Sequence, residues 1–261
     1  FRSVETVTAT IVITPTSATG LGTDVLSLIE AANLTGDANA QTITTTTFTG
    51  PVTINAGAGN DTIRTGSGAD SIVGGSGNDD IDSGAGNDTL LGENGNDKLF
   101  SGSGNDSIDG GTGADNIFAG DGNDVAQGGD GNDSIRGGIG NDTLLGGAQD
   151  DTLKGEGGDD SLDGGDGNDG LAGGDGNDFL AGGAGADQML GQAGNDTLQG
   201  GEGNDSIQGG AGADVVNGQG GTDKVAGGSG RQSSADTGDR VTGLTNEIDE
   251  FFTLAPSWLN T

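Results

Sequence analysis

The sequence predicts an all-β solenoid, in which short strands recur along the chain and stack on one another. Three observations support this fold class. Asp recurs every nine residues without a failure from Asp61 to Asp223, an apolar residue follows each Asp by two positions, and Gly precedes all but one of them by two positions. A repeat of fixed length indicates one structural unit used many times, and such units bury their apolar side chains by stacking.

Each repeat reads G-G-x-G-x-D-x-U-x, where U is apolar, and the array runs from Ala56 to Ala226. Its six Gly-rich residues predict a turn, because Gly adopts positive φ without steric cost. The segment x-U-x predicts a three-residue strand with U pointing inward and its two neighbours outward. Only Ala126 is a small residue at U. One inward side chain per nine residues stabilises a coil only if the coils stack.

The composition is far from that of an ordinary globular domain. The 261 residues include 59 Gly, 41 Asp or Glu and 8 Lys or Arg, which gives a net charge of −33, and only 29% are hydrophobic. Typical domains contain about 7% Gly, so an unusually large share of this chain has no side chain that could form a core. Low hydrophobicity with high net charge is typical of disordered chains, so the folded state needs something that neutralises the charge.

The same numbers exclude several classes of function. Nucleic-acid binding requires Lys and Arg to displace counterions, and anionic membranes repel so acidic a chain. No apolar run approaches the roughly 18–20 residues of a membrane span, so we expect no membrane insertion. The chain has no His and no Cys, which removes the usual zinc, haem and iron–sulfur sites and the Ser-His-Asp and Cys-His catalytic sets. We expect no enzymatic activity.

At these repeats the chain resembles the RTX (hemolysin-type) calcium-binding β-roll, a likeness that covers 171 of 261 residues and rests on the known RTX nonapeptide. The resemblance implies a right-handed parallel β-roll with two nonapeptides per coil, capped at both ends. Residues 18 apart would then stack. It also implies Ca²⁺ as the bound ion, with turn carbonyls completing each coordination shell.

Stacking at 18 residues sorts the Asp residues into two columns, and we expect all nineteen to be metal ligands. The odd repeats contribute Asp61, Asp79, Asp97, Asp115, Asp133, Asp151, Asp169, Asp187, Asp205 and Asp223. The even repeats contribute Asp70, Asp88, Asp106, Asp124, Asp142, Asp160, Asp178, Asp196 and Asp214. Carboxylates one coil apart repel unless a cation lies between them. Nine gaps in one column and eight in the other allow up to 17 interior Ca²⁺ ions, and Mg²⁺ fits less well because it demands a tight octahedron.

In five repeats, another residue replaces the second or the fourth glycine of the turn. Gln149 replaces the fourth-position Gly, where positive φ is expected, so we predict perturbed sites at Asp133, Asp151 and Asp169. The second Gly is replaced in four repeats, and we expect these to be milder departures because that position would point outward. The four residues are Glu93, Glu156, Gln192 and Gln219.

Residues 1–55 predict an N-terminal β-rich cap to the roll of residues 56–226. Val7 to Ile13 alternate apolar and polar residues, which is typical of a strand. Residues 36–44 match the nonapeptide with Gln41 in place of Asp, which indicates a coil that binds no metal. Alternatively, Asp24 to Ala32 forms a short helix or a docking segment.

Residues 227–261 predict a C-terminal capping segment, because an open solenoid end exposes apolar side chains and strand edges. They hold the densest apolar cluster of the chain: Val241, Leu244, Ile248, Phe251, Phe252, Leu254, Trp258 and Leu259. The alternative is a type I secretion signal, which lies at the extreme C-terminus in relatives.

The outward residues distinguish the two predicted sheets. All five basic residues of the array fall in odd repeats, namely Arg64, Lys98, Arg136, Lys154 and Lys224. Phe100 and Phe118 lie 18 residues apart on the same sheet, where they should stack. We expect this face to contact a flank or another copy, the alternative being a merely solubilising surface.

These observations predict a secreted, extracellular calcium-binding structural module that folds on Ca²⁺ binding, as part of a larger surface, adhesin or matrix protein. The alternative is a calcium-dependent C-terminal module of a type I-secreted enzyme or toxin. An ice-binding solenoid needs a regular Thr rank, and only Thr112 occupies the third turn position as Thr. A glycan-acting enzyme with paired carboxylates is disfavoured, because metal binding accounts better for the Asp residues.

Overall fold

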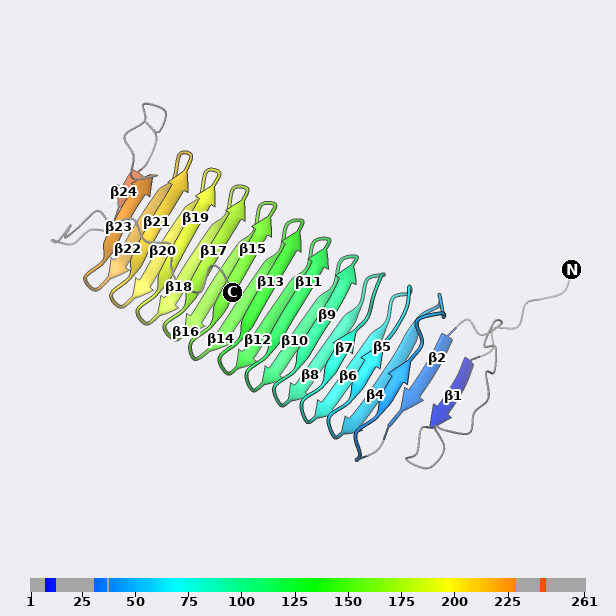
Figure 1. The fold of residues 1–261 in the computed structure, drawn as a ribbon. Helices are drawn as coiled ribbons and strands as arrows, with labels where there is room; N and C mark the ends of the chain where they lie inside the picture. The colour runs from blue at the N-terminus through cyan, green and yellow to red at the C-terminus, as the bar shows by residue number, and fades with distance from the viewer. Residues whose placement is uncertain (1–7, 13–30, 37, 229–239, 243–261) are drawn as a thin grey trace, which may run out of the picture.

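The computed structural model describes residues 8–12, 31–36, 38–228 and 240–242. These residues form strands that stack along one axis into an elongated molecule (Figure 1). The predicted fold class is confirmed, since the chain is an all-β parallel β-solenoid of about 11 turns with about 18 residues per turn. None of the described residues belongs to a helix long and apolar enough to cross a membrane.

The strands follow one another at intervals of about nine residues. In chain order they are β1 (Thr8–Val12), β2 (Ala31–Thr35), β3 (Thr42–Thr44), β4 (Val52–Ala58), β5 (Thr62–Arg64), β6 (Ser71–Ser76), β7 (Asp80–Asp82), β8 (Thr89–Asn94), β9 (Lys98–Ser103), β10 (Ser107–Thr112), β11 (Asn116–Asp121), β12 (Val125–Asp130), β13 (Ser134–Ile139), β14 (Thr143–Ala148), β15 (Thr152–Gly157), β16 (Ser161–Asp166), β17 (Gly170–Asp175), β18 (Phe179–Ala184), β19 (Gln188–Ala193), β20 (Thr197–Glu202), β21 (Ser206–Ala211), β22 (Val215–Gly220), β23 (Lys224–Gly228) and β24 (Arg240–Thr242).

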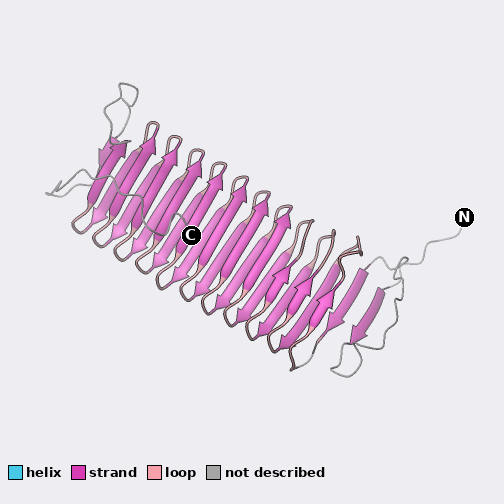
Figure 2. Ribbon diagram, in the orientation of Figure 1, coloured by secondary structure: helices cyan, strands magenta, loops and turns pink. Residues whose placement is uncertain are grey.

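Two parallel sheets face each other across the core (Figure 2). The odd repeats supply an 11-stranded sheet that runs from β3 to β23, and the even repeats lie in a 13-stranded sheet that runs from β1 to β24. Within each sheet, residues 18 apart are paired: Ile117 pairs with Leu99 on one side and with Ile135 on the other. The expected coil of two nonapeptides is therefore the structural unit.

The core is a continuous stack of the inward U residues. From Ile63 to Val225 every one of them is buried, and Ala126 is fully buried as well. Ile43, Val52 and Ile54 extend the core toward the N-terminus. Fully burying an aliphatic side chain contributes roughly 1.5–3 kcal/mol. The apolar contribution of one coil thus comes from little more than two side chains.

The strands are longer than the three residues predicted. Most array strands have six residues, because they continue through the two glycines that follow x-U-x. Glycine backbones of neighbouring coils pair directly, as Gly111 does with Gly129. The predicted length holds within the array only for β5 and β7. Periodicity alone did not indicate that the turn glycines also form a parallel ladder.

The second turn glycine also requires an unusual backbone conformation. Glu93, Glu156, Gln192 and Gln219 have φ values of 74°, 77°, 80° and 69°, and Gln149 has 80°. All five lie in the left-handed region that costs a residue with a side chain of order 1 kcal/mol or more. The prediction of a milder departure at the second glycine was therefore wrong.

The described parts of the two flanks continue the stack. Ile43 of β3 lies in register with Ile63, and the Gln41 backbone N–H donates to Asp61 Oδ1 at 2.6 Å. At the other end, β24 pairs in parallel with β22 and places Val241 opposite Val216. The predicted helix or docking segment at 24–32 lies outside the described residues except for Ala31 and Ala32, which begin β2. The C-terminal apolar cluster beyond residue 242 also lies outside them, and the domain boundaries stay predictions.

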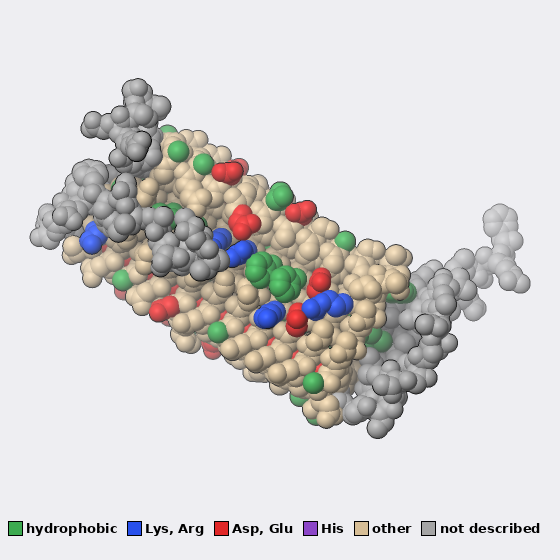
Figure 3. Space-filling model, viewed as in Figure 1, with side chains coloured by type: hydrophobic (Ala, Val, Ile, Leu, Met, Phe, Trp, Pro, Cys, Tyr) green, Lys and Arg blue, Asp and Glu red, His purple; other side chains and the backbone are tan. Residues whose placement is uncertain are grey.

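The outward faces differ as predicted. Phe100 and Phe118 stack with their ring centroids 4.8 Å apart and their planes 3° from parallel, and the Arg136 guanidinium lies 5.2 Å from the centre of the Phe118 ring. All five basic residues of the array lie on strands of the 11-stranded sheet. Figure 3 shows hydrophobic side chains gathered midway along the stack with Lys and Arg side chains on both sides. Contact of this face with a flank or another copy stays a prediction.

Candidate metal centre

All nineteen array Asp residues are buried, with no more than 6% of any one exposed. Each closes a turn immediately before a strand, so the two sheets arrange them in the two predicted columns. Their carbonyls join the backbone ladder; for example, the Asp61 oxygen accepts the Asp80 N–H at 2.9 Å. The position of each carboxylate is thus fixed by the backbone pairing on its C-terminal side.

One oxygen of each carboxylate is engaged by the preceding coil. The backbone N–H of an Asp donates to Oδ1 of the Asp 18 residues later, as between Asp97 and Asp115 at 2.7 Å and between Asp205 and Asp223 at 3.1 Å. We call this series the aspartate ladder. It runs through both columns, and Val52 and Gln41 supply the first N–H groups. The columns were predicted from the spacing of the Asp residues, but these hydrogen bonds were not.

The second oxygen has no such partner. In the sixteen Asp residues from Asp70 to Asp205, Oδ2 is buried without a hydrogen bond. In the turns that begin with glycine, it lies against that glycine, five residues earlier, so closely that a side chain there would overlap it; Gly92 and Asp97 are one example. The carbonyl of Gly110, one coil later, would also overlap a side chain at Gly92. Burying polar oxygens without a partner is costly, so these oxygens indicate a ligand.

Burial makes the charged form of these carboxyls unfavourable. Desolvation is the largest cause in every case; the ladder N–H acts against it, and nearby carboxylates, where they contribute, add to it. The pKa is raised to about 7 at Asp97, Asp151 and Asp160. It is raised to about 6 at Asp124, Asp133, Asp169, Asp178, Asp187, Asp196 and Asp205. A cation beside each column would relieve this penalty and favour the ionised form.

The donor set fits a hard cation. The turns offer only carboxylate and carbonyl oxygens, which are the ligands that Ca²⁺ takes in sets of six to eight. Among the described residues no three acidic side chains converge on one point. A cation between two coils would therefore meet the Asp of each coil and require turn carbonyls for the rest of its shell, as the resemblance implies.

The expected perturbation around Gln149 is absent from the ladder. Asp133 N–H to Asp151 Oδ1 and Asp151 N–H to Asp169 Oδ1 both measure 2.8 Å, like the rest of the column. The Gln149 backbone N–H still reaches the Asp166 carbonyl, at 2.6 Å. The turn therefore accommodates Gln149 at positive φ without moving its Asp, and the predicted perturbation of the metal sites at Asp133, Asp151 and Asp169 stays a prediction.

A second ladder of hydrogen bonds lies outside the aspartate ladder and was not predicted from the sequence. The residue before the Asp is usually Asn, and its Oδ1 accepts the backbone N–H 18 residues later, as Asn78 does from Asn96 and Asn123 does from Asn141, at 3.0 and 2.8 Å. Asp150 substitutes for Asn and accepts from Asn168. The recurrent Asn-Asp pair was the signal. These amides tie successive turns in the direction opposite to the aspartate ladder.

Comparison with known families agrees with this geometry. The model of the RTX calcium-binding nonapeptide repeat, which spans four copies of the unit, matches residues 53–81, 73–108, 91–126, 109–144, 136–171, 171–198 and 199–231. No curated protein matches the chain. Because the family matches together extend from residue 53 to residue 231, well over half of the chain, this protein belongs to the RTX calcium-binding nonapeptide repeat family.

Proposed function

We propose that this chain is a secreted, calcium-dependent structural module that folds when Ca²⁺ binds, as part of a larger extracellular surface, adhesin or matrix protein. The observation that carries the proposal is the row of buried Oδ2 atoms without hydrogen bonds from Asp70 to Asp205. These sixteen atoms lie in two regular columns, and a series of cations bound along the columns would neutralise the charge of their carboxylates. The family match supports calcium as the ion.

Charge supports the coupling of binding to folding. Full occupancy of 17 gaps would bring 17 × 2 = 34 positive charges against a net charge of −33. Without cations, the carboxylates of each column repel one another at the same time as they lose their hydration. A ligand that binds only the folded state stabilises it by RT ln(1 + [L]/Kd) per site. Many sites in one stack therefore make folding steeply dependent on Ca²⁺.

The same coupling suits export. Where Ca²⁺ is scarce, inside a cell, the chain would stay extended, and it would fold outside, where Ca²⁺ is abundant. We further propose that the module has no catalytic activity, because its nineteen array Asp side chains are buried between coils and are better suited to hold cations than to meet a substrate. Its regular outward faces suit a structural role, in which the module contacts neighbouring molecules or holds other parts of a larger protein at a fixed distance.

Far-UV circular dichroism tests the proposal. In calcium-free buffer we expect a largely disordered spectrum, and in millimolar Ca²⁺ a cooperative rise of β structure. Millimolar Mg²⁺ serves as the matched control and should give little or no β signal, because Mg²⁺ retains its water and demands octahedral geometry. A β spectrum that is the same with and without Ca²⁺ would contradict the proposal.

A further inference from the structure

The outward face of the 11-stranded sheet carries a groove whose floor is strand β17. The outward residues of this strand are Gly170, Ala172 and Gly174, so nothing larger than a methyl group rises from it. The neighbouring strands β15 and β19 have larger side chains in register with these three positions: Thr152 and Gln188, Lys154 and Leu190, and Glu156 and Gln192. No other described strand of the array has two glycines and an alanine at its outward positions. We call this feature the β17 groove.

The floor of the β17 groove is buried. Ala172 is only 3% exposed although it points outward, and Gly170 and Gly174 are buried as well. Ala181, the corresponding residue of β18 in the opposite sheet, is only partly buried. Residues of β15, β17 and β19 together line a cavity of about 340 Å³ above the floor. The cavity therefore has room for side chains that enter from outside the sheet.

Two residues of the walls adopt a backbone conformation that favours glycine. Glu156 and Gln192 have φ values of 77° and 80°, and within the described strands of the 11-stranded sheet they are the two residues with side chains at positive φ. Gly174 lies between them in register. Such a conformation costs of order 1 kcal/mol or more, and residues that retain it are often found at functional sites. Here both strained residues form the walls of the same groove.

The floor of the groove suits apolar side chains. The backbone of β17 is paired with β15 on one side and with β19 on the other, so a further strand cannot add to it. What remains accessible from above is the methyl group of Ala172 and the neighbouring side chain of Leu190. A partner would therefore be held by side chains that enter the groove, and burial of apolar surface would drive the contact.

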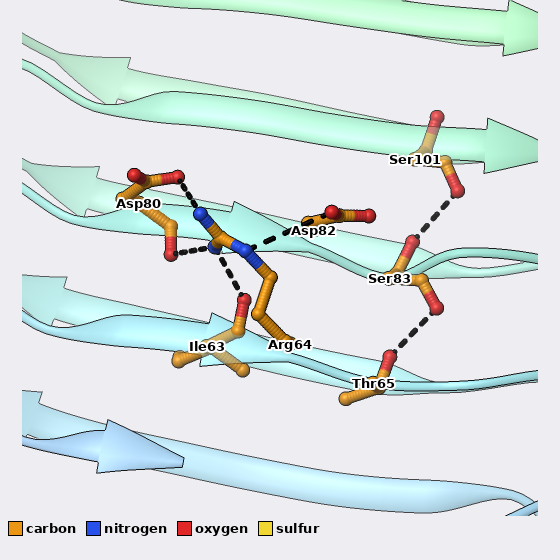
Figure 4. Close-up of polar contacts among 7 residues, drawn as sticks. All are labelled: Ile63, Arg64, Thr65, Asp80, Asp82, Ser83 and Ser101. Atoms are coloured by element: carbon orange, nitrogen blue, oxygen red, sulfur yellow. Dashed lines mark hydrogen bonds and ion pairs between the residues drawn. The ribbon is translucent and has the colours of Figure 1, made fainter. Parts of the chain in front are cut away.

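Positive charge lies beside the groove. Arg136 of β13 is in register with Lys154, so two cationic side chains are direct neighbours. Desolvation lowers the pKa of Lys154 and Arg136 lowers it further, while Glu156 acts in the opposite direction. Arg64, elsewhere on the same face, lies against a carboxylate of its own sheet, with Nη2 2.8 Å from Asp80 Oδ1 (Figure 4). Two adjacent cations favour an acidic partner, because opposite charge relieves their mutual repulsion.

The chain itself contains a segment of matching chemistry. Residues 243–261 follow β24 and include three acidic residues, no Lys or Arg, and two adjacent Phe residues directly after the acidic ones. The acidic residues are Glu247, Asp249 and Glu250, and the two Phe residues are Phe251 and Phe252. The combination of negative charge with large apolar side chains complements both the cationic pair and the apolar floor.

The segment is long enough to reach the groove. β24 ends at Thr242, and three strand spacings separate it from β18, the strand that follows β17 in the chain. Three spacings are about 15 Å, and the two sheets lie about 10 Å apart. The nineteen residues 243–261 span up to about 60 Å when extended. Because the turn after β22 leads the chain to β23 in the 11-stranded sheet, the chain leaves the parallel strand β24 toward the same sheet.

We propose that residues 243–261 fold back along the side of the roll and dock in the β17 groove, with Phe251 and Phe252 over Ala172 and the acidic residues toward Arg136 and Lys154. This contact differs from a cap on the open end of the stack, which would cover β23 and β24 and leave β17 uncovered. It also leaves the stacked rings of β9 and β11 uncovered, so it is compatible with self-association through them.

Tryptophan fluorescence tests the place of docking, because the chain has a single Trp, no Tyr and no Cys. The double substitution Phe252→Trp/Trp258→Phe moves the reporter to the docked position. A nitroxide attached through Gln188→Cys, at the rim of the groove, should quench it severalfold in saturating Ca²⁺. The same label attached through Thr197→Cys, at the corresponding position of β20 in the opposite sheet, is the control and should not. Equal emission from the two labelled chains would overturn the inference.

A mixing experiment distinguishes this segment from that of a second copy. A labelled chain without Trp, Gln188→Cys/Trp258→Phe, is mixed with the unlabelled reporter chain. We expect no quenching in the mixture, because each groove is occupied by its own chain. Quenching there as strong as within one chain would show that another copy fills the groove, and would overturn the inference.

Filling the groove provides a test without any label. Ala172→Phe should displace the segment, so chymotrypsin should cut within residues 243–261 about tenfold faster than in wild type, because cleavage follows the population of the undocked segment. Ala181→Phe, the matched control on β18, should be cut at the wild-type rate. Equal rates in all three chains, with circular dichroism showing them folded in Ca²⁺, would overturn the inference and leave the proposed function standing. Chains that form no β structure in Ca²⁺ would contradict the proposed function and, because the groove exists only in the folded roll, the docking as well.

Discussion

The backbone N–H of Asp133 donates a hydrogen bond of 2.8 Å to Oδ1 of Asp151, while Oδ2 of Asp151 is buried without a partner. One oxygen thus holds the coil register, and the other is left for a cation. Asp150, the neighbouring residue, is exposed, and its Oδ1 accepts both the backbone and the side-chain N–H of Asn168, which lowers its pKa. Adjacent residues of identical chemistry therefore have different roles.

The first prediction compares these two residues. Asp151→Asn keeps an oxygen for the Asp133 N–H but removes the charge at Oδ2, and Asp151 borders two gaps. We expect it to lower the number of bound Ca²⁺ ions by one or two, and to weaken those sites by about tenfold, which is about 1.4 kcal/mol. Asp150→Asn, the matched control, should leave the ion count at the wild-type value. Native mass spectrometry and a Ca²⁺ titration followed by circular dichroism measure both. Equal effects of the two substitutions would contradict the role assigned to Asp151.

The second prediction concerns the strained turn residues. Gln149 has a φ of 80°, which favours glycine, so Gln149→Gly should raise the free energy of unfolding in saturating Ca²⁺ by about 0.5–1 kcal/mol. Gln127→Gly, in the interior of β12 where φ is not positive, should lower it by roughly the same amount. Urea denaturation in constant Ca²⁺ gives both values. A loss of stability in both variants would show that Gln149 is not strained.

The third prediction follows from the raised pKa values. The pKa of Asp97, Asp151 and Asp160 is about 7 in the folded chain, compared with about 3.9 in an unfolded one. Between these values the folded state holds more protons than the unfolded state. The calcium-free chain therefore gains stability as pH falls from about 7 to about 4, and loses it again as pH rises through about 7.

Circular dichroism in calcium-free buffer over this pH range measures the effect, and β structure should increase on acidification. In a parallel titration the Ca²⁺ concentration needed for folding should rise as pH falls, because protons compete with the cation for the same carboxylates. A β signal that decreases on acidification of the calcium-free chain would contradict this sign.

The fourth prediction concerns the stacked rings on the 11-stranded sheet. The double variant Phe100→Ser/Phe118→Ser should leave Ca²⁺-induced folding nearly intact, at a cost of about 0.5–1.5 kcal/mol beyond lost burial, because the inward residues Leu99 and Ile117 are unchanged. It should weaken self-association, measured by sedimentation velocity in Ca²⁺. Val125→Ser, an exposed residue of the opposite sheet, is the control and should have no effect on association. A wild-type chain that is monomeric at all concentrations would contradict the proposed contact.

The structural features that depend only on residue spacing could be predicted from the sequence. Every inward apolar residue, the two Asp columns and the stacking of Phe100 on Phe118 follow from an 18-residue coil and strand alternation. Features that depend on backbone hydrogen bonds were not foreseen. A glycine pattern does not distinguish a loose turn from a paired strand, so the six-residue strands and the positive φ of Glu93 became visible only in the structure.

At the candidate metal site, too, features set by residue spacing were predicted and features set by backbone hydrogen bonds were not. Spacing predicted where each carboxylate lies, but not that one of its oxygens is occupied by a backbone N–H. The role of Asn96 and the other turn amides was also missed, because residue spacing does not show which backbone N–H group a turn side chain accepts. The hydrogen bond from the Thr65 hydroxyl to the Ser83 carbonyl was not predicted either, since a small polar residue in place of glycine changes no periodicity.

Successive repeats alternate between the two sheets. A change in chain length of nine residues therefore has a different effect from a change of eighteen residues. Both sheets carry the same inward residue and the same buried Asp, so gain or loss of a single nonapeptide would keep the interior intact. It would nevertheless transfer every downstream outward side chain to the opposite surface. Removal of residues 106–114, for instance, would place Phe100 and Phe118 on different sheets, whereas removal of a full coil elsewhere would leave them together. The length of the array can thus change freely in steps of one nonapeptide, but its surface pattern survives only in steps of two.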